Sequence, residues 1–414
     1  MYDFFIDASY CFDRLKVWIS INEVFMYKRS LTPVLERFAK IYLIVGITGP
    51  HQSGKTTLAK QVFPQLPYVS LENLDTRLLA KDNPRGFLKQ YAQGAIIDRI
   101  QHVPELLSYM QQIAGDSSQK GRFIIIGSQD FFLSENTLQS LSGCIGMTTL
   151  LPLSLAELGA TDSYQDRIFR GGYPVLYGAG MTPTDFYPSY IQTYVERGVR
   201  QVKNIEQLGK FQLFLKLCAG RIGQLMNLSS LAQDCGISHT TARQWLTVLE
   251  ASYIIFFLQP FYKNFNKRLV KIPKLYFYDT GLACSLLGLE KENQVEAHYL
   301  KGALYENMVV VELLKNRFNK ALPTNLFFWR DQTGHEVDII AEWGGSIKAI
   351  EVKSGSTFQP DFIKNVRYFT DLVATRHPEE KTKSYVIYGG EQQGVFSGTQ
   401  LVPFLALDKI INEE

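Results

Sequence analysis

A glycine-rich turn near the start of the chain carries the residue types that hold phosphate groups in proteins. Residues 49–56 read Gly-Pro-His-Gln-Ser-Gly-Lys-Thr, which fits the spacing G-x-x-x-x-G-K-[ST]. Glycines let backbone N–H groups point toward an anion, the lysine would reach the β- and γ-phosphates of a nucleotide, and the threonine hydroxyl would bind Mg²⁺. Between an apolar run and a predicted helix, this pattern favours a nucleotide site over an ordinary glycine-rich turn. The cofactor contacts expected here come from Gly49, Ser53, Gly54, Lys55, Thr56 and Thr57.

Two further apolar runs end in polar residues that would complete such a site. Asp98 follows the first run and would hold Mg²⁺ through water. The next residue is Arg99, where many P-loop ATPases have a glutamate that orients the attacking water, and a guanidinium cannot act as that base because it stays protonated at neutral pH. The run Phe123–Ile126 leads to Ser128 and Gln129, either of which would sense a γ-phosphate. The alternative for each of these residues is an ordinary polar residue at a strand end.

Near the other end of the chain, two stretches of alternating apolar and polar residues flank Gly344-Gly345 and predict a β-hairpin with a two-residue turn. If Trp343 pairs with Ser346, Asp338 lies directly opposite Glu351. Two facing carboxylates repel each other unless a cation lies between them. The register therefore predicts a carboxylate pair on one face of this hairpin.

A divalent metal site for phosphodiester hydrolysis is the chemistry that this pair favours. Asp338 and Glu351 would bind Mg²⁺, and Lys353, on the same face as Glu351, would steady the attacking water or the developing negative charge. Glu306, on the helical stretch before the hairpin, would complete the set. The alternative is a charged edge hairpin with ordinary solvent-facing acids.

A DNA-reading module is predicted between these two sites. Residues 228–238 predict a helix and a glycine turn, and a second helix follows with Ala242, Trp245, Leu246 and Leu249 on its buried side. The residues of that helix that would face a DNA groove are His239, Thr241, Arg243 and Gln244. A run without acids then predicts a hairpin wing for phosphate contacts, with the basic residues Lys263, Lys267, Arg268, Lys271 and Lys274. The alternative is a winged helix that packs between domains.

The elements that must position these residues alternate between strands and helices, which predicts an α/β fold with a parallel sheet around the phosphate-binding turn. The chain has 414 residues, enough for more than one core. The expected divisions are a poorly placed N-terminal extension at 1–25, a P-loop domain at 26–160, a helical region at 161–222, a winged-helix-like domain at 223–285 and a C-terminal α/β domain at 286–414.

Composition limits the class of protein further. Hydrophobic residues make up 46% and charged residues 20%, which excludes broad disorder. The 43 basic residues nearly balance the 40 acidic ones, which excludes a histone-like polybasic protein. The 5 widely spaced cysteines, with no Cys-x-x-Cys pair, argue against disulfides and zinc fingers and favour a reducing cytoplasm. No apolar run approaches roughly 20 residues, the length of a membrane helix, so no membrane partner is expected.

From Met26 onward, the ordered set of motifs resembles a prokaryotic family of AAA-plus-type P-loop ATPases with a winged helix and a C-terminal restriction-endonuclease-like domain of unknown function. The motifs that carry the resemblance are Gly49–Thr57, Asp98–Leu106, Gly127–Gln129, Leu151–Leu158, Arg170–Pro174, Tyr194–Arg200, Tyr278–Gly281, Gly302–Asn307, Phe328–Arg330, Glu336–Asp338 and Glu351–Lys353. The resemblance implies ATP and Mg²⁺ as cofactors, ATPase activity, and a nuclease-like domain at 286–414. Its nuclease-like motif maps to Glu306, Asp338, Glu351 and Lys353.

Three departures from the family pattern bear on turnover. Arg99 replaces a glutamate, the stretch ending at Cys144 lacks the usual arginine, and Gly198 replaces an aspartate. The remaining candidate arginine fingers are Arg170, Arg197 and Arg200. Two hypotheses follow: an ATPase that couples nucleotide state to duplex DNA binding and a metal-dependent nuclease-like domain, or a non-hydrolysing ATP-binding regulator or scaffold. Assembly into a homo-oligomer is left open.

Overall fold

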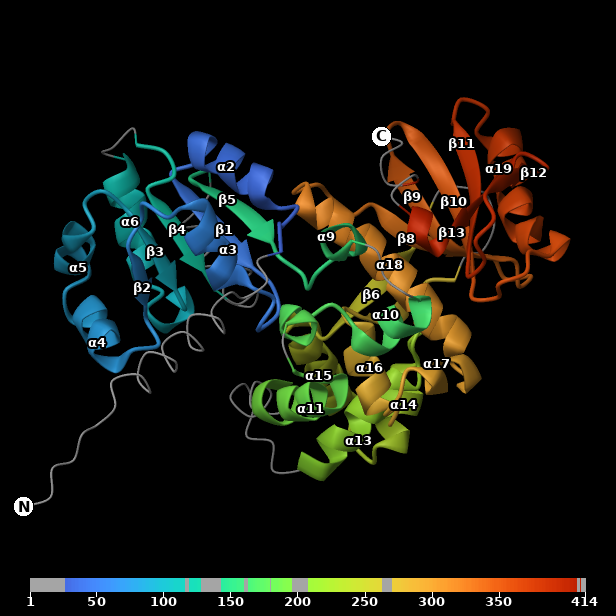
Figure 1. Cartoon of the computed structure of the whole chain (residues 1–414), viewed down its shortest axis with the longest axis horizontal. Helices are drawn as coiled ribbons and strands as arrows, with labels where there is room; N and C mark the ends of the chain where they lie inside the picture. The colour runs from blue at the N-terminus through green and yellow to red at the C-terminus, as the bar shows by residue number, and fades with distance from the viewer. Residues whose placement is uncertain are drawn as a thin grey trace, which may run out of the picture.

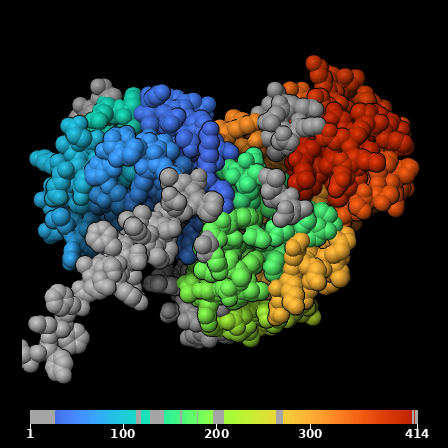
Figure 2. All heavy atoms as spheres, in the orientation of Figure 1, coloured from blue at the N-terminus to red at the C-terminus, as the bar shows by residue number. Residues whose placement is uncertain are grey.

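The computed structural model describes residues 27–115, 119–127, 143–159, 163–178, 180–195, 208–262, 270–407 and 410. Some expectations fall outside this part of the chain. They concern the extension at 1–25, Ser128, Gln129, Arg197, Gly198, Arg200, Lys263, Lys267 and Arg268. Figure 2 shows an N-terminal lobe in blue and a C-terminal lobe in red at opposite ends of the molecule, with green residues of the middle segment between them.

The N-terminal lobe is built on a five-stranded parallel sheet with the order β2-β3-β4-β1-β5 (Figure 1). Its strands are β1 (Ile44–Thr48), β2 (Tyr68–Ser70), β3 (Ala95–Asp98), β4 (Phe123–Ile126) and β5 (Ile145–Thr149). Its helices are α2 (Thr32–Ile41), α3 (Lys55–Val62), α4 (Leu74–Asp82), α5 (Pro84–Gln90), η1 (Ile100–His102) and α6 (Leu106–Gly115). Successive side chains of a strand point to opposite faces of the sheet. Ile96 packs in one hydrophobic core and Ile97 in another, so both faces of the sheet are covered. The predicted α/β fold with a parallel sheet is confirmed for this lobe.

The middle segment is helical, apart from one hairpin. Its helices and helical turns are α9 (Leu155–Leu158), α10 (Tyr164–Arg170), η2 (Pro174–Tyr177), α11 (Pro183–Tyr190), η3 (Ile191–Val195), α13 (Leu208–Ala219), α14 (Leu228–Asp234), α15 (His239–Ala251), α16 (Thr280–Leu286) and α17 (Asn293–Ala297). The side chains of Asn227 and Ser238 cap α14 and α15 by accepting from backbone N–H groups. The buried face predicted for α15 is confirmed, because Ala242, Trp245, Leu246 and Leu249 are all buried.

The C-terminal lobe contains an eight-stranded mixed sheet with the order β12-β13-β11-β10-β9-β8-β6-β7. Its strands are β6 (Ile255–Pro260), β7 (Lys274–Phe277), β8 (Leu326–Arg330), β9 (Glu336–Trp343), β10 (Ser346–Lys353), β11 (Thr382–Tyr388), β12 (Gly394–Phe396) and β13 (Thr399–Pro403). Its helices are α18 (Lys301–Asn319), η4 (Pro360–Ile363), α19 (Lys364–Arg376) and η5 (Phe404–Ala406). In the part of the chain that the structure covers, no helix combines the length and apolarity needed to cross a bilayer.

The β6–β7 hairpin lies in the segment expected to form the winged helix, yet it continues the C-terminal sheet. Strand β6 runs parallel to β8, with Gln259 opposite Phe327, and every residue of β7 is buried. The expectation that Lys274 contacts phosphate from an exposed wing is therefore wrong. The residues that follow this lysine along β7 are apolar and buried, so the strand enters a core and takes the lysine with it.

The hairpin register predicted around Gly344-Gly345 is confirmed. Trp343 pairs with Ser346, and the antiparallel ladder continues to Ile339 and Ile350. Both glycines have positive φ, 58° and 68°, as a two-residue turn of this kind requires. The ladder ends at that pair. The next residues, Asp338 and Glu351, lie near each other, since the Asp338 side chain accepts from the backbone N–H of Val352 and its charge adds to the effect of burial in raising the pKa of Glu351. Their direct facing stays a prediction.

Helix α18 connects the parts of the molecule (Figure 1). It packs against β10 and β7 of the C-terminal sheet, against α10 and α16 of the middle segment, and against β5 of the N-terminal lobe. Helix α18 is therefore in contact with the N-terminal lobe, the middle segment and the C-terminal sheet.

Candidate functional site

The turn between β1 and α3 has the backbone shape of a phosphate cradle. Gly54 precedes α3 in the left-handed region at φ 94°, and Gly49 has φ 140°. A Cβ added to Gly49 would lie 2.2 Å from the carbonyl oxygen of Leu150, so a side chain does not fit there. The Oγ of Ser53 is buried and has no hydrogen-bond partner. An orphaned buried donor inside this turn fits a bound anion.

Lys55 opens helix α3, and its side chain folds back over the loop. Its Nζ donates to the carbonyl oxygens of Gly49 at 2.9 Å and of Pro50 at 2.6 Å. Burial and, to a smaller extent, the positive charge of Arg99 lower the pKa of Lys55 to about 7, although the charge of Asp98 raises it. A phosphate oxygen would be a stronger partner for this ammonium group than a carbonyl.

Asp98, at the end of β3, meets the loop where the Mg²⁺ site is predicted. Its Oδ2 accepts from Thr56 Oγ1 at 2.7 Å and from the Tyr68 hydroxyl at 3.0 Å. Its Oδ1 accepts from the backbone N–H of Arg99 at 2.8 Å. The structure thus brings Thr56 and Asp98 together, whereas Thr57 is exposed.

Arg99 turns back toward the loop from the end of β3. Its backbone is left-handed at φ 58°, and its guanidinium lies 3.0 Å from Nε2 of His51. Burial, with smaller contributions from the charges of Arg99 and Lys55, lowers the pKa of His51 to about 4, so this imidazole is neutral near pH 7. The same ring stacks on Tyr194 of η3, 4.9 Å between ring centres.

Arg29 holds the phosphate loop through its guanidinium group, a contact that the sequence analysis did not predict. Its guanidinium donates to the carbonyls of Ser53 at 2.8 Å and Leu151 at 2.6 Å, and pairs with Glu157 at 3.1 Å. Arg29 and Glu157 are buried, with 6% and 1% of their side chains exposed. No motif marks an arginine twenty residues before such a loop, because the contact exists only after folding.

A second buried cluster continues from Glu157 to α18. The backbone N–H of Leu155 donates to Glu312 at 2.8 Å, and Glu312 also pairs with Arg167 at 3.1 Å and Lys315 at 2.8 Å. All three charged side chains are buried. Glu312 of helix α18 is therefore bound by two residues of the segment that follows the N-terminal sheet, through the backbone of Leu155 and the guanidinium of Arg167.

Of the two predicted carboxylates of the β9–β10 hairpin, Glu351 is buried and Asp338 is half-buried. Lys353 Nζ pairs with Glu351 Oε1 at 2.7 Å, whereas Glu351 Oε2 is buried without a partner. Asp338 Oδ2 accepts from the backbone N–H of Val352 at 2.8 Å. Burial and repulsion by Asp338 raise the pKa of Glu351 to about 8. The alternative of solvent-facing acids on an edge hairpin is wrong for Glu351, which is 3% exposed.

Glu306 approaches this pair from α18 and is shared with a lysine. Lys274 Nζ lies 3.1 Å from Glu306 Oε1 and 2.5 Å from Glu336 Oε1, and the Tyr276 hydroxyl also donates to Glu306. Burial raises the pKa of Glu306 to about 7, with Lys274 opposing and Asp338 adding to the rise. Among the described side chains, no three His, Cys, Asp or Glu residues form a group that could hold a metal ion.

Other predicted residues lie elsewhere. On α15, His239 and Arg243 are exposed, and Thr241 and Gln244 are half-buried. Lys271, shortly before β7, is exposed. Arg170 pairs with Asp166 on its own helix at 2.9 Å, so the structure gives it no contact with the loop.

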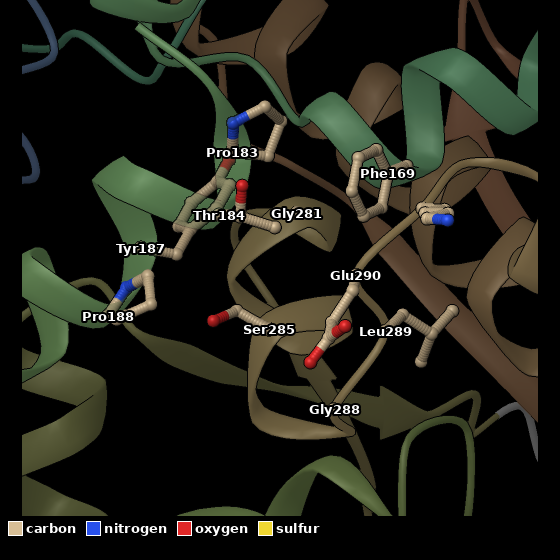
Figure 3. A pocket seen from close by; sticks show the side chains of 11 residues that line it. Phe169, Pro183, Thr184, Tyr187, Pro188, Gly281, Ser285, Gly288, Leu289 and Glu290 are labelled. Carbon is tan, nitrogen blue, oxygen red and sulfur yellow. The ribbon is translucent and has the colours of Figure 1, made fainter.

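A hollow of about 450 Å³ lies between α10, α11 and α16 (Figure 3). Phe169, Tyr187 and Pro183 line it, with Ser285 and Glu290 on the other side. The Tyr187 hydroxyl donates to Asp279 at 2.6 Å, away from the hollow. None of the lining residues belongs to the phosphate loop or the carboxylate cluster, so this hollow is separate from both.

Three successive segments of the chain match known domain families. Residues 42–159 match an AAA domain, residues 161–293 match a domain of unknown function, DUF8612, and residues 301–407 match another, DUF4143. The chain is 29% identical over 386 residues to the uncharacterized proteins Mb2031c of Mycobacterium bovis and Rv2008c of Mycobacterium tuberculosis, covering 92% of this chain and 84% of each relative.

Similar solved structures include the Walker-type ATPase PABY2304 of Pyrococcus abyssi, 14% identical over 63% of this chain and 96% of that one, with a TM-score of 0.39. A DNA replication initiation factor is 12% identical over 70% of this chain and 92% of that one, with a TM-score of 0.27. The AAA match and the parallel sheet identify residues 42–159 as a P-loop ATPase domain of the AAA type.

Proposed function

We propose that this chain binds Mg-ATP in the loop at 49–56 and couples its nucleotide state to DNA binding and to a metal-dependent nuclease-like segment. One observation carries the proposal: Thr56 contacts Asp98 at 2.7 Å beside a loop that already has the shape of a phosphate cradle. In P-loop NTPases the Ser or Thr of the loop and an Asp at the end of a neighbouring strand hold the magnesium ion, and Thr56 and Asp98 have these two places here. The AAA match over the same residues supports this reading.

The residues around the loop fit this ligand. Thr56 and Asp98 would hold Mg²⁺, which would neutralise charge on the phosphate oxygens. Lys55 would exchange the carbonyls of Gly49 and Pro50 for phosphate oxygens, and the Ser53 hydroxyl would gain a partner. The N-terminus of α3 adds positive potential at the same place.

Arg29 offers a physical route for the coupling. It joins the loop at Ser53 to Leu151 and Glu157, and the adjoining Leu155 reaches Glu312 on α18. The same helix presents Glu306 to the carboxylate cluster. A change in loop shape on binding nucleotide would therefore act on α18, the element that both lobes share.

The C-terminal cluster supports a cation-binding role in this proposal. Glu351 holds a buried oxygen without a partner beside Asp338, and burial and repulsion have raised its pKa. Asp338 and Glu351 would bind Mg²⁺ or Mn²⁺, which supplies Lewis acidity for phosphodiester cleavage. Lys353 would place positive charge near the developing anion.

A second candidate is a nucleotide-holding regulator that does not turn over ATP. Arg99 favours it, because no carboxylate follows Asp98 to orient the attacking water. Phosphate release from Mg-ATP, measured with and without duplex DNA, separates the two. Release that DNA stimulates supports the coupled ATPase, whereas nucleotide binding without release supports the regulator.

The DNA contact has its own test on the exposed face of α15. Arg243→Gln is expected to weaken binding to duplex DNA and to reduce the slope of log affinity against log salt by about one unit if this guanidinium contacts a phosphate. Lys89→Gln, exposed on α5, is the control for net charge. Equal slopes in both variants and the unmodified chain would favour a packing role for the helix pair.

A further inference from the structure

Arg99 holds an unusual place for a cation. It is the first residue after β3, and its left-handed backbone is stabilised by the hydrogen bond from its own N–H to Asp98. This conformation returns the side chain toward the phosphate loop instead of away from the sheet. The guanidinium ends 3.0 Å from His51, the third residue of the loop.

The positive charge of Arg99 is only weakly paired. Its guanidinium forms an ion pair with Glu72 at 3.8 Å, and because Glu72 is 69% exposed this is a weak surface pair. Both oxygens of Asp98 already accept hydrogen bonds, from Thr56, Tyr68 and the Arg99 backbone. Lys55 donates to neutral carbonyls. Two cations and a helix N-terminus therefore converge on the loop with one buried acid between them.

His51 is a weak partner for Arg99. Two ring nitrogens compete poorly with phosphate oxygens for a guanidinium, which binds phosphate through two parallel N–H groups. The His51 ring is also held by stacking on Tyr194, so it can keep its position when the guanidinium moves. Arg99 is 31% exposed and so is not locked by packing.

We propose that Arg99 binds the γ-phosphate of ATP and makes this loop discriminate ATP from ADP. This proposal rests on nucleotide binding at the loop, as proposed above. It gives a role to Arg99, which cannot act as the base that a glutamate at this position provides. The position that orients water in many P-loop ATPases instead neutralises the terminal phosphate. The expected result is a chain that retains ATP, because ground-state charge is stabilised and no base is supplied.

The test measures equilibrium affinities for ATP and ADP, each with Mg²⁺, by calorimetry on the full chain. Arg99→Gln is expected to weaken ATP about tenfold or more and ADP less than about twofold, since only ATP carries the γ-phosphate. Arg99→Lys keeps the charge without the paired N–H groups and is expected to fall between. The control is Arg85→Gln, which removes an exposed positive charge elsewhere in the N-terminal lobe and is expected to change neither affinity.

The outcomes separate this inference from the proposed function. Equal weakening of ATP and ADP in Arg99→Gln would overturn the γ-phosphate contact and leave Arg99 as a support for His51. Unchanged affinities in Arg99→Gln would overturn it as well. An unmodified chain that binds neither nucleotide would instead overturn nucleotide binding itself. Thermal melting of each variant establishes that a lost affinity does not come from unfolding.

Discussion

The phosphate loop and the carboxylate cluster both gather charge, but they balance it in opposite ways. At the loop, Lys55 donates to backbone carbonyls, which are neutral, and burial lowers its pKa to about 7. At the cluster, Glu306 and Glu351 each contact a lysine, and burial still raises their pKa values to about 7 and 8. The first site thus favours an added anion and the second an added cation.

The difference teaches where each site obtains its partners. The loop itself is one continuous segment, and the charged residues that contact it are Asp98 and Arg99 at the end of β3 and Arg29 before α2. The cluster takes Lys274 from β7, Glu306 from α18 and the hairpin acids from β9 and β10. Burial by itself would lower the pKa of Lys274. The nearby Glu306, Asp338 and Glu336 outweigh that effect and raise the pKa well above its ordinary value, so this lysine stays charged among the acids. A metal ion at the cluster would compete with a cation that the fold itself supplies.

The largest expected effect tests the cluster alone. Asp338→Asn removes one of the two hairpin carboxylates and is expected to abolish any Mn²⁺-dependent cleavage of DNA while ATP affinity stays unchanged. The measurement is cleavage of a labelled duplex, with nucleotide affinity as the internal control. Cleavage that persists in Asp338→Asn would show that the activity lies elsewhere, and a lost ATP affinity would show that the sites are not separable.

The next largest effect tests the loop alone. Lys55→Ala is expected to weaken Mg-ATP about tenfold to a hundredfold, because a charge-assisted hydrogen bond to phosphate is lost while the backbone cradle remains. Calorimetry measures the change, and Lys60→Ala, on the same helix but exposed, is the control. Equal affinity in Lys55→Ala and the unmodified chain would refute the nucleotide site.

The ion pair below the loop gives an effect on stability. Arg29→Met leaves Glu157 buried without its partner and is expected to cost about 3 kcal/mol, seen as a decrease of several degrees in the apparent melting temperature. Combining it with Glu157→Gln is expected to recover part of the loss, because no lone buried charge remains. A melting temperature unchanged by Arg29→Met would show that the pair contributes nothing to stability.

The smallest effect is a pH dependence at the cluster. Since the folded pKa of Glu351 is about 8 against an ordinary value of 4.5, the folded state binds a proton that the unfolded state lacks between these values. Stability is therefore expected to fall as pH rises from about 5 to 8. Glu351→Gln mimics the protonated acid and is expected to flatten the curve of melting temperature against pH by a few degrees, whereas Glu290→Gln, on the surface, is not.

Local patterns predicted more of this molecule than distant contacts did. The loop spacing predicted a glycine-rich turn followed by a helix, since both depend on neighbouring residues, and the structure has Gly54 in a left-handed conformation directly before α3. The buried face of α15 followed from helical periodicity. The sequence predicts an exposed wing for Lys274 because this lysine ends a run of basic residues without acids, but strand β7 is buried on both faces. A charge run says little about a residue whose partners come from another element.

The sequence by itself determined the phosphate cradle and the pairing of Trp343 with Ser346, because each depends on backbone geometry over a few residues. Tertiary structure alone decided that Arg29 supports the loop, that Arg99 meets His51 and that Lys274 joins the carboxylates. These contacts join residues tens of positions apart through strands and helices whose packing is set by the shared cores. Charge can be placed in such a core only where the fold brings a partner to it.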